Sequence, residues 1–235
     1  MKILVLSDIH GNATALEAVL RAAASRGAEH IINAGDLIGY YHQPERVLSL
    51  LAEWPMDCVR GNHENMLQRA IKDPAFLADC TARYGSGLAR AIEWLRPAQI
   101  EWLLDLPAIT QFQRGRFRVL LAHGTPKDVD EYLYPDASEE KLEQVEAACG
   151  QGVDLLVLGH THYQKLWDRS ALRILNPGSV GQPRDRVPGA AWALLDTESG
   201  EIDLYRQAYD SVPVADAARR LDPAQPYLWT VLERR

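Results

Sequence analysis

Five short segments with the composition of buried β-strands each lead directly into side chains that can bind a metal ion. The segments are Ile3–Leu6, Ile31–Ala34, Cys58–Arg60, Val119–Ala122 and Leu155–Leu158. The motifs that follow them are Ser7-Asp8-Ile9-His10, Gly35-Asp36, Gly61-Asn62-His63-Glu64, His123-Gly124 and Gly159-His160-Thr161-His162. Because sites in α/β sheets form at the carboxyl ends of the strands, we expect the five motifs to form one site.

The order of the predicted elements indicates an α/β protein. A helix that Asn12 caps and Gly27 ends separates the first two strands, and this βαβ unit implies parallel pairing with a right-handed crossover. A second helix is predicted from about Pro44 to Glu53. Residues 65–107 contain no strand-like run, so we expect a helical insertion that flanks or partly covers the site.

The rest of the chain is predicted to return to strands after one more helix, which Ser138 caps. Arg173–Leu175 is a further strand, and Ala191–Leu195 and Ile202–Tyr205 form a β-hairpin around residues 197–200. A short helix at about residues 216–221 and a loose tail complete the chain. No linker interrupts this order, and the motifs span Asp8 to His162, so we expect a single domain over residues 1–235.

Composition restricts the partners and the compartment. The formal net charge of −7 disfavours an extended nucleic-acid-binding surface, which needs clustered Lys and Arg. No apolar stretch approaches the ~20 residues that span a bilayer, and the first residues are too short and too polar for a signal peptide. Cys58, Cys80 and Cys149 are odd in number and widely spaced, which predicts reduced thiols and a cytoplasmic protein.

Seven side chains are candidate metal ligands: Asp8, His10, Asp36, Asn62, His123, His160 and His162. This set of nitrogen and oxygen donors without a thiolate suits manganese, iron, cobalt, nickel or zinc better than calcium or magnesium. Seven ligands are too many for one tetrahedral ion, but they fit two ions that share a carboxylate. Two divalent ions outweigh the two aspartates, and the remaining positive charge favours a hydroxide and a phosphoryl group.

His63 is left over from this set, and it could protonate a leaving oxygen or stabilise charge on the phosphoryl oxygens. Each motif alone is a weak signal, because a lone His or Asp usually belongs to an ordinary loop or core. The conjunction of five motifs, which use five of the seven histidines, favours a site. Of the other two, His30 is expected to be structural, whereas His42 either packs or reaches the substrate.

Taken together, the motifs resemble those of the calcineurin-like metallophosphoesterases, and most of all the small bacterial phosphodiesterase branch. The opening Ser7-Asp8-Ile9-His10-Gly11-Asn12 and the later Asn176-Pro177-Gly178-Ser179, with Pro183-Arg184, are typical of that branch. The resemblance covers nearly the whole chain. It implies a four-layer αββα sandwich of two mixed β-sheets flanked by helices.

The resemblance also implies the roles of the motif residues. One metal would be held by Asp8, His10, Asp36 and His162, and the second by Asp36, as the bridge, with Asn62, His123 and His160. His63 would be the catalytic histidine. The superfamily usually has Asp after this histidine, whereas the chain has Glu64. If that acid orients His63, the extra methylene requires a changed backbone or rotamer, which puts the rate in question.

Substrate contacts are less constrained by the sequence. Arg184 either contacts the phosphate or forms a salt bridge with Asp185 or another neighbouring carboxylate. Four tyrosines in loops near the motifs either pack or stack on a base or an aryl leaving group. They are Tyr40, Tyr41, Tyr134 and Tyr163.

The sequence therefore predicts a hydrolase in which a hydroxide that bridges two metal ions, most suitably manganese, attacks a phosphodiester. A phosphomonoesterase or protein phosphatase with the same site is the alternative among enzymes. A non-catalytic protein-binding scaffold, the role of one retromer subunit with this fold, is the alternative of another class. The expected partner is a small phosphoester or nucleotide-like substrate, and the sequence leaves the physiological substrate, the native metal and the oligomeric state open.

Overall fold

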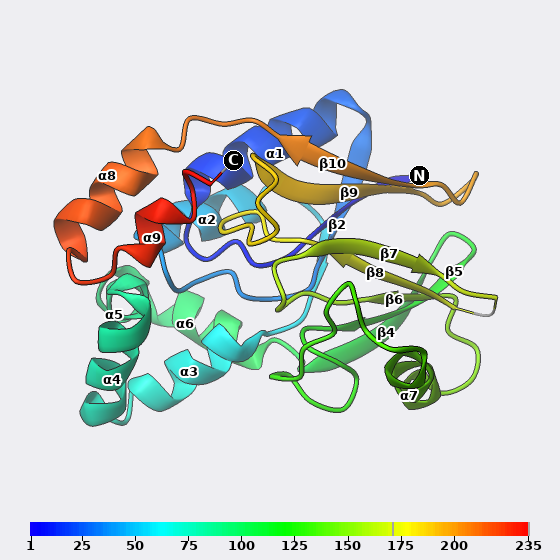
Figure 1. Ribbon diagram of the computed structural model, residues 1–235, viewed down its shortest axis with the longest axis horizontal. Helices are drawn as coiled ribbons and strands as arrows, with labels where there is room; N and C mark the ends of the chain where they lie inside the picture. Colours follow the sequence, from blue (N-terminus) through cyan, green and yellow to red (C-terminus); the bar gives the residue numbers. More distant parts are fainter. Residues whose placement is uncertain (171, 235) are drawn as a thin grey trace.

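A computed structural model describes residues 1–170 and 172–234, and within them ten strands form two five-stranded mixed sheets (Figure 1). The first sheet has the order β10 (Ile202–Gln207), β9 (Ala190–Asp196), β1 (Lys2–Leu6), β2 (Ala28–Asn33) and β3 (Met56–Cys58). The second has the order β4 (Ile109–Arg114), β5 (Phe117–Ala122), β6 (Leu155–Val157), β8 (Arg173–Pro177) and β7 (Gln164–Asp168).

The two sheets pack face to face through apolar side chains that alternate along the central strands. Ile3 and Val5 of β1 belong to the same buried cluster as Val119 and Leu121 of β5 and Leu155 of β6. Successive side chains of a strand point to opposite faces, so this cluster is the apolar layer between the sheets.

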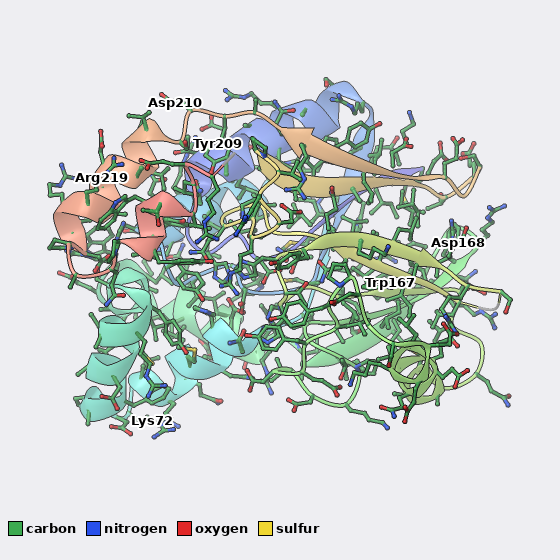
Figure 2. The ribbon with its side chains drawn as sticks, in the orientation of Figure 1. Lys72, Trp167, Asp168, Tyr209, Asp210 and Arg219 are labelled. Carbon is green, nitrogen blue, oxygen red and sulfur yellow. The ribbon has the colours of Figure 1, made fainter. Side chains whose placement is uncertain are left out.

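The outer faces of both sheets are covered by helices. Leu4 and Leu6 of β1 cluster with apolar side chains of α1 (Ala13–Ser25) and α2 (Pro44–Leu51). On the other side, Leu120 of β5 clusters with α7 (Glu139–Cys149), and Trp167 of β7, labelled in Figure 2, belongs to the same cluster. The order of layers is therefore helix, sheet, sheet, helix, which confirms the predicted αββα sandwich.

Parallel pairing brings the predicted motifs to one edge of this sandwich. In β1 and β2 the last residues, Leu6 and Asn33, lie opposite each other, and Leu121 of β5 lies opposite Val157 of β6. Each of these strands is followed within a few residues by a motif. Segments that are far apart in the sequence thus deliver their side chains to the same place.

Residues 65–107 are helical, as the sequence predicts: α3 (Asn62–Ala70), α4 (Pro74–Tyr84), α5 (Gly87–Trp94) and α6 (Pro97–Asp105). Figure 1 shows these helices grouped beside the ends of the sheets, with α8 (Val212–Leu221) and α9 (Tyr227–Thr230) next to α5. No helix in the described parts of the chain combines the length and the apolar composition needed to cross a bilayer.

Two expectations from the sequence differ from the structure. The tail is not loose, because α9 is anchored by a hydrogen bond of 3.0 Å from the Tyr41 hydroxyl to the Leu228 carbonyl. The strands β4 and β7 were not predicted. Both lie at edges of the second sheet, where β4 alternates between exposed and half-buried residues, so neither has the apolar composition of a central strand.

Candidate metal centre

The structure brings all seven predicted ligands together at the edge where the two sheets meet. Asp8 and His10 follow β1, Asp36 follows β2, and Asn62 begins α3. His123 follows β5, and His160 and His162 lie between β6 and β7. Apart from Asn62, which is half-buried, these residues are buried.

An unusual backbone conformation is shared by most of these residues. Asp8, His10, Asp36, His160 and His162 have φ angles of 54°, 51°, 56°, 65° and 62°, in the left-handed region that residues other than glycine rarely adopt. Hydrogen bonds between the loops hold this conformation, including Asp8 N–H to Gly35 O at 3.0 Å and His10 N–H to Asp36 O at 2.9 Å. Such strained positions persist where the surroundings over-determine them, and they cluster at functional sites.

A first group of ligand atoms forms around Asp8, His10 and His162, whose candidate ligand atoms lie within 4.8 Å of one another. The Nε2 atoms of His10 and His162 are 3.0 Å apart, and His162 Nε2 is 3.3 Å from an Asp8 carboxylate oxygen. Asp36 Oδ2 lies 3.6 Å from His10 Nε2.

A second group forms on the other side of Asp36. His123 Nε2 lies 3.3 Å from Asp36 Oδ2 and 3.1 Å from Asn62 Oδ1. The ring of His160 is 5.0 Å from that of His123, centroid to centroid. Asp36 therefore contacts both groups, which is the place that the predicted bridge requires.

The hydrogen bonds of the histidines decide which ring nitrogens carry protons. Nδ1 of His10, His123 and His162 lies 3.2, 2.6 and 2.7 Å from the backbone carbonyls of Ile38, Ala34 and Gln182. A carbonyl only accepts, so each Nδ1 must donate, and a neutral ring then presents an Nε2 lone pair to the centre. His160 is reversed, because its Nε2 lies 3.1 Å from Asp130 O and leaves Nδ1 as the acceptor.

The centre is therefore lined by acceptors. When both rings are neutral, the lone pairs on Nε2 of His10 and Nε2 of His162 lie close together and repel each other. A proton or a metal cation between the two nitrogens removes this repulsion. The same holds for His123 Nε2, which faces oxygens of Asp36 and Asn62. The backbone N–H groups of His63 and His160 donate to Asp36 and Asp8. The other groups that converge here are nitrogen and oxygen acceptors, and such a set, with its outer ring nitrogens fixed by carbonyls, fits a divalent transition metal.

The pKa shifts of the metal-free site have the same origin. Burial lowers the pKa of His10 and of His162, each with a neighbouring positive charge adding to the effect. Burial also opposes the charged form of His123, but the Asp36 carboxylate outweighs it and raises that pKa to about 10. The pKa of Asp36 lies well below its usual range despite burial, because His123 and His63 stabilise its charge.

His63, predicted to be the catalytic histidine, lies against this group of ligands. Its ring centroid is 4.6 Å from that of His10 and 4.8 Å from that of Tyr40. Its Nδ1 is buried and has no hydrogen-bond partner in the described part of the chain. Gly39 makes room for the ring, because a Cβ there would lie 2.0 Å from Nδ1.

Glu64 makes a different contact from the one considered in the sequence. Instead of bonding to the His63 ring, its carboxylate accepts hydrogen bonds from the backbone N–H groups of Asp36 (3.0 Å), Leu37 (2.9 Å) and Gly61 (2.7 Å). Neighbouring residues of a helix point in different directions, so Glu64 turns toward the loop that carries Asp36. Burial, with the Asp36 charge adding to it, raises the pKa of Glu64 to about 7.

Of the predicted substrate contacts, Arg184 and Tyr40 lie beside the centre. Arg184 Nη2 donates to the Tyr40 hydroxyl at 3.0 Å and to Gln182 Oε1 at 3.1 Å. The alternative of a salt bridge with Asp185 is not observed, because Asp185 pairs with Arg206. The ring of Tyr40 is edge-on to that of His10, with centroids 4.4 Å apart.

The other tyrosines and histidines considered in the sequence either pack in the interior or lie at the surface. Tyr41 is buried under α9, as described above, and His42 is buried with Nε2 2.6 Å from Asp222, so both serve packing. His30 lies 2.8 Å from Asp57 and is structural, as expected. Tyr134 contacts Tyr163 edge-on, with centroids 5.8 Å apart.

The sequence did not single out Tyr132, which stacks on His160 with centroids 4.1 Å apart. Only its spacing of two residues from Tyr134, within a loop that follows a motif, could have indicated it.

Replacement of Glu64 tests its part in holding the Asp36 loop. Glu64→Ala leaves the N–H groups of Asp36, Leu37 and Gly61 buried without an acceptor, and each such loss costs about 1–3 kcal/mol. We expect urea unfolding to show a loss of at least about 3 kcal/mol, whereas Glu143→Ala on the exposed face of α7 changes stability by less than about 0.5 kcal/mol. Equal stability of the two variants would contradict this role.

The buried histidines predict that the metal-free protein loses stability in acid. Burial lowers the pKa of His10, His63, His160 and His162 below 6.5, so the unfolded chain binds more protons below that pH. Their stabilisation is present above pH 6.5 and is lost as the pH falls. Because the contribution of His123, with its raised pKa, is complete below 6.5, it does not offset this loss. Glu64 acts in the opposite direction, because its pKa of about 7 lets the folded state hold a proton in this range, and it offsets the loss at about one histidine.

Urea unfolding of chelator-treated protein at pH 6.5 and 5.0 measures the effect. Each histidine that stays neutral in the folded state contributes a loss of at most about 2 kcal/mol over this interval. A protein that is equally stable or more stable at pH 5.0 would show that the folded state binds at least as many protons over this interval as the unfolded chain, so that burial does not keep these rings neutral.

The chain is similar to known proteins over most of its length. A profile described as the calcineurin-like phosphoesterase superfamily domain matches residues 1–200. An uncharacterized protein of Methanocaldococcus jannaschii is 31% identical over 88% of each chain. The phosphodiesterase YfcE of Escherichia coli is 27% identical over 84% of this chain and 89% of its own.

The fold of the chain is also found among solved structures. The metallophosphoesterase from Sphaerobacter thermophilus superposes with a TM-score of 0.78 over 100% of this chain and 98% of its own, at 26% identity. The matched region contains all five motifs, from Asp8 to His162. The chain therefore belongs to the calcineurin-like phosphoesterase superfamily.

Proposed function

We propose that the chain hydrolyses phosphodiester bonds with two divalent transition-metal ions bound at the centre described above. The observation that supports the proposal is the convergence of buried carboxylates and imidazoles into overlapping clusters, two of which contain Asp36. Its Oδ2 lies 3.6 Å from His10 Nε2 and 3.3 Å from His123 Nε2. The superfamily supports metal-dependent phosphoester hydrolysis. The number of ions, their identity and the preference for diesters are parts of the proposal.

The two groups divide the ligands between the ions. Asp8, His10, Asp36 and His162 would hold one ion, and Asp36, Asn62, His123 and His160 would hold the other. Manganese suits this set of imidazole, carboxylate and amide donors. Two such ions, when bound, activate water and neutralise charge on a phosphoryl group.

The protein adds groups that act on the substrate directly. His63 lies against the first group of ligands with its Nδ1 unpartnered, and its imidazole either donates a proton to the leaving oxygen or stabilises charge on the phosphoryl oxygens. Its backbone N–H donates to Asp36 Oδ1 at 2.9 Å, which fixes the start of α3 beside the shared carboxylate.

Arg184 has the environment of an anion-binding residue. In the described part of the chain its guanidinium contacts neutral oxygens and no carboxylate, and its Nε is buried without a partner. It lies close to the centre, because the Tyr40 ring to which it is bonded is edge-on to that of His10. Because a largely buried cation is costly without an anion, we propose that Arg184 contacts the phosphate.

The name of the similar phosphodiesterase YfcE supports diesters over monoesters. A phosphomonoesterase or protein phosphatase with the same site remains the alternative within the superfamily. A non-catalytic scaffold needs no acceptor-lined centre, so the complete set of seven candidate ligands with His63 favours an enzyme.

Metal removal and replacement test the reaction. Chelator-treated protein should cleave neither bis(p-nitrophenyl) phosphate nor p-nitrophenyl phosphate, and added Mn²⁺ should restore cleavage, with the diester cleaved faster. Mass spectrometry of the restored protein should find two manganese ions per chain. His63→Ala should lower kcat by about 10²–10⁴-fold while both ions stay bound, because general acid–base groups contribute that much.

Each outcome separates one part of the proposal from the others. Faster cleavage of the monoester would keep the metal site and overturn the substrate class. Two bound ions without cleavage of either ester would point to Glu64 as the cause, and Glu64→Asp, which restores the residue usual in the superfamily, would be the next variant to assay. Protein that binds no metal would overturn the proposal that the chain is a metal-dependent enzyme and would leave the scaffold.

Replacement of Arg184 tests the phosphate contact. Arg184→Ala should raise KM for the diester by roughly 10-fold or more, because it removes a charge-assisted hydrogen bond to the substrate. Arg186→Ala is the matched control, since this neighbour is exposed. Equal KM values for the two variants would assign Arg184 to packing with Tyr40.

A further inference from the structure

Two exposed tyrosines form a surface beside the candidate metal centre, and we refer to Tyr132 and Tyr134 as the tyrosine shelf. Their exposed fractions are 43% and 44%. Leu133 between them is buried in the cluster under α7, so the two rings lie on the outer side of the same extended segment. Large apolar rings are usually covered, and two that stay exposed side by side next to a site suggest a ligand.

The shelf begins at a predicted metal ligand and leads away from it. Tyr132 stacks on His160 with centroids 4.1 Å apart and planes at 27°. Tyr134 is parallel to Tyr132, with centroids 5.2 Å apart and planes at 2°. Both His160 and Tyr134 stack on Tyr132, and Tyr163 meets Tyr134 edge-on with centroids 5.8 Å apart. The surface left to a ligand is the exposed part of each ring, 43% of Tyr132 and 44% of Tyr134.

The loop that carries the shelf is held by contacts on several sides. Asp130 O lies 3.1 Å from His160 Nε2, and the Thr125 hydroxyl donates to Glu131 at 2.5 Å. Lys141 of α7 forms an ion pair with Glu131. At Gly124 a Cβ would lie 2.4 Å from Val129 O, so the loop backbone packs directly on the strand end. The rings are thus positioned before any ligand binds.

The shelf and the proposed phosphate contact meet at the same motif, His160-Thr161-His162. Tyr132 stacks on His160, and Arg184 donates to the hydroxyl of Tyr40, whose ring centroid lies 6.3 Å from that of His162. The shelf and Arg184 are therefore connected through the two histidines of one motif. A phosphate bound between the metal centre and Arg184 would therefore have the tyrosine shelf within reach of one of its substituents.

We propose that the tyrosine shelf binds a planar aromatic group attached to the phosphate, so that the preferred substrates are esters of nucleosides or of aryl alcohols. This inference rests on the proposed function, because it needs the phosphate to bind at the metal centre. Stacking on exposed aromatic side chains is tolerant of the identity of the ring, so nucleobases and simple aryl groups share the same chemistry.

Binding of three phosphate monoesters to the manganese-loaded protein tests the shelf by calorimetry, without reliance on turnover. Methyl phosphate has no ring, phenyl phosphate has an aryl group, and thymidine 5′-monophosphate has a nucleobase. We expect the two aromatic esters to bind at least about tenfold more tightly than methyl phosphate, which is the range of one stacking contact. The better of the two identifies the kind of ring.

The variants separate stacking from support of the metal site. Tyr134 does not stack on His160, so Tyr134→Leu should remove most of the preference for aromatic esters without loss of manganese, and Tyr134→Phe should keep the preference. Tyr132→Leu combined with Tyr134→Leu should abolish it. Trp102→Leu, which changes an exposed aromatic residue of α6, is the control and should leave the preference unchanged.

The failures of the two proposals differ. If none of the three esters binds to manganese-loaded protein, the proposed phosphate site is wrong. If all three bind with equal affinity, or if the preference survives in the Tyr132→Leu/Tyr134→Leu protein, the phosphate site stands and the tyrosine shelf is overturned.

Discussion

The structure depends on one buried point at which carboxylates and imidazole nitrogens converge. Most of these groups are hydrogen-bond acceptors. Carboxylates of Asp8 and Asp36 face imidazole nitrogens whose protons are committed elsewhere, to the carbonyls of Ile38, Ala34 and Gln182. Without a cation the site must hold protons in a place where burial opposes them, as the lowered pKa of His10 and the raised pKa of His123 show. A metal ion removes this conflict, because it satisfies several acceptors at once.

The architecture provides this point and fixes its geometry. Parallel strands of two facing sheets end at one edge, and the chain turns there through left-handed conformations at Asp8, Asp36 and His160. Glu64 adds the contact that holds the Asp36 turn from the side of α3. Loops that are bound to one another in this way keep their strained conformation, and they keep the ligand atoms within a few ångströms of each other.

Much of this arrangement could be predicted from the sequence, because it follows from local patterns. Apolar strand segments, the Asn12 cap and the spacing of the motifs predicted the βαβ start and the common site. The four-layer sandwich came from the resemblance to a superfamily, since alternation alone does not show how two sheets stack. The strands β4 and β7 were missed because edge strands carry polar residues, and α9 was missed because tertiary contacts hold it.

The contacts of single side chains were predicted less well, because they depend on directions that the sequence does not contain. Glu64 follows His63, yet the helix turns it toward Asp36. Arg184 precedes Asp185, yet it contacts Tyr40. Tyr132 gained importance only when the fold placed it on His160. In each case the partner is remote in sequence or lies on another face of the same element.

The most direct test of the account is the position of metal in a crystal grown with Mn²⁺. An anomalous difference map recorded at the manganese edge should show two peaks about 3.5–4 Å apart, with the Asp36 carboxylate between them. One peak should lie near Nε2 of His10 and His162, and the other near Nε2 of His123. A map without peaks at these atoms, or with its peaks elsewhere on the chain, would contradict the reading of the acceptor-lined centre as a pair of metal sites.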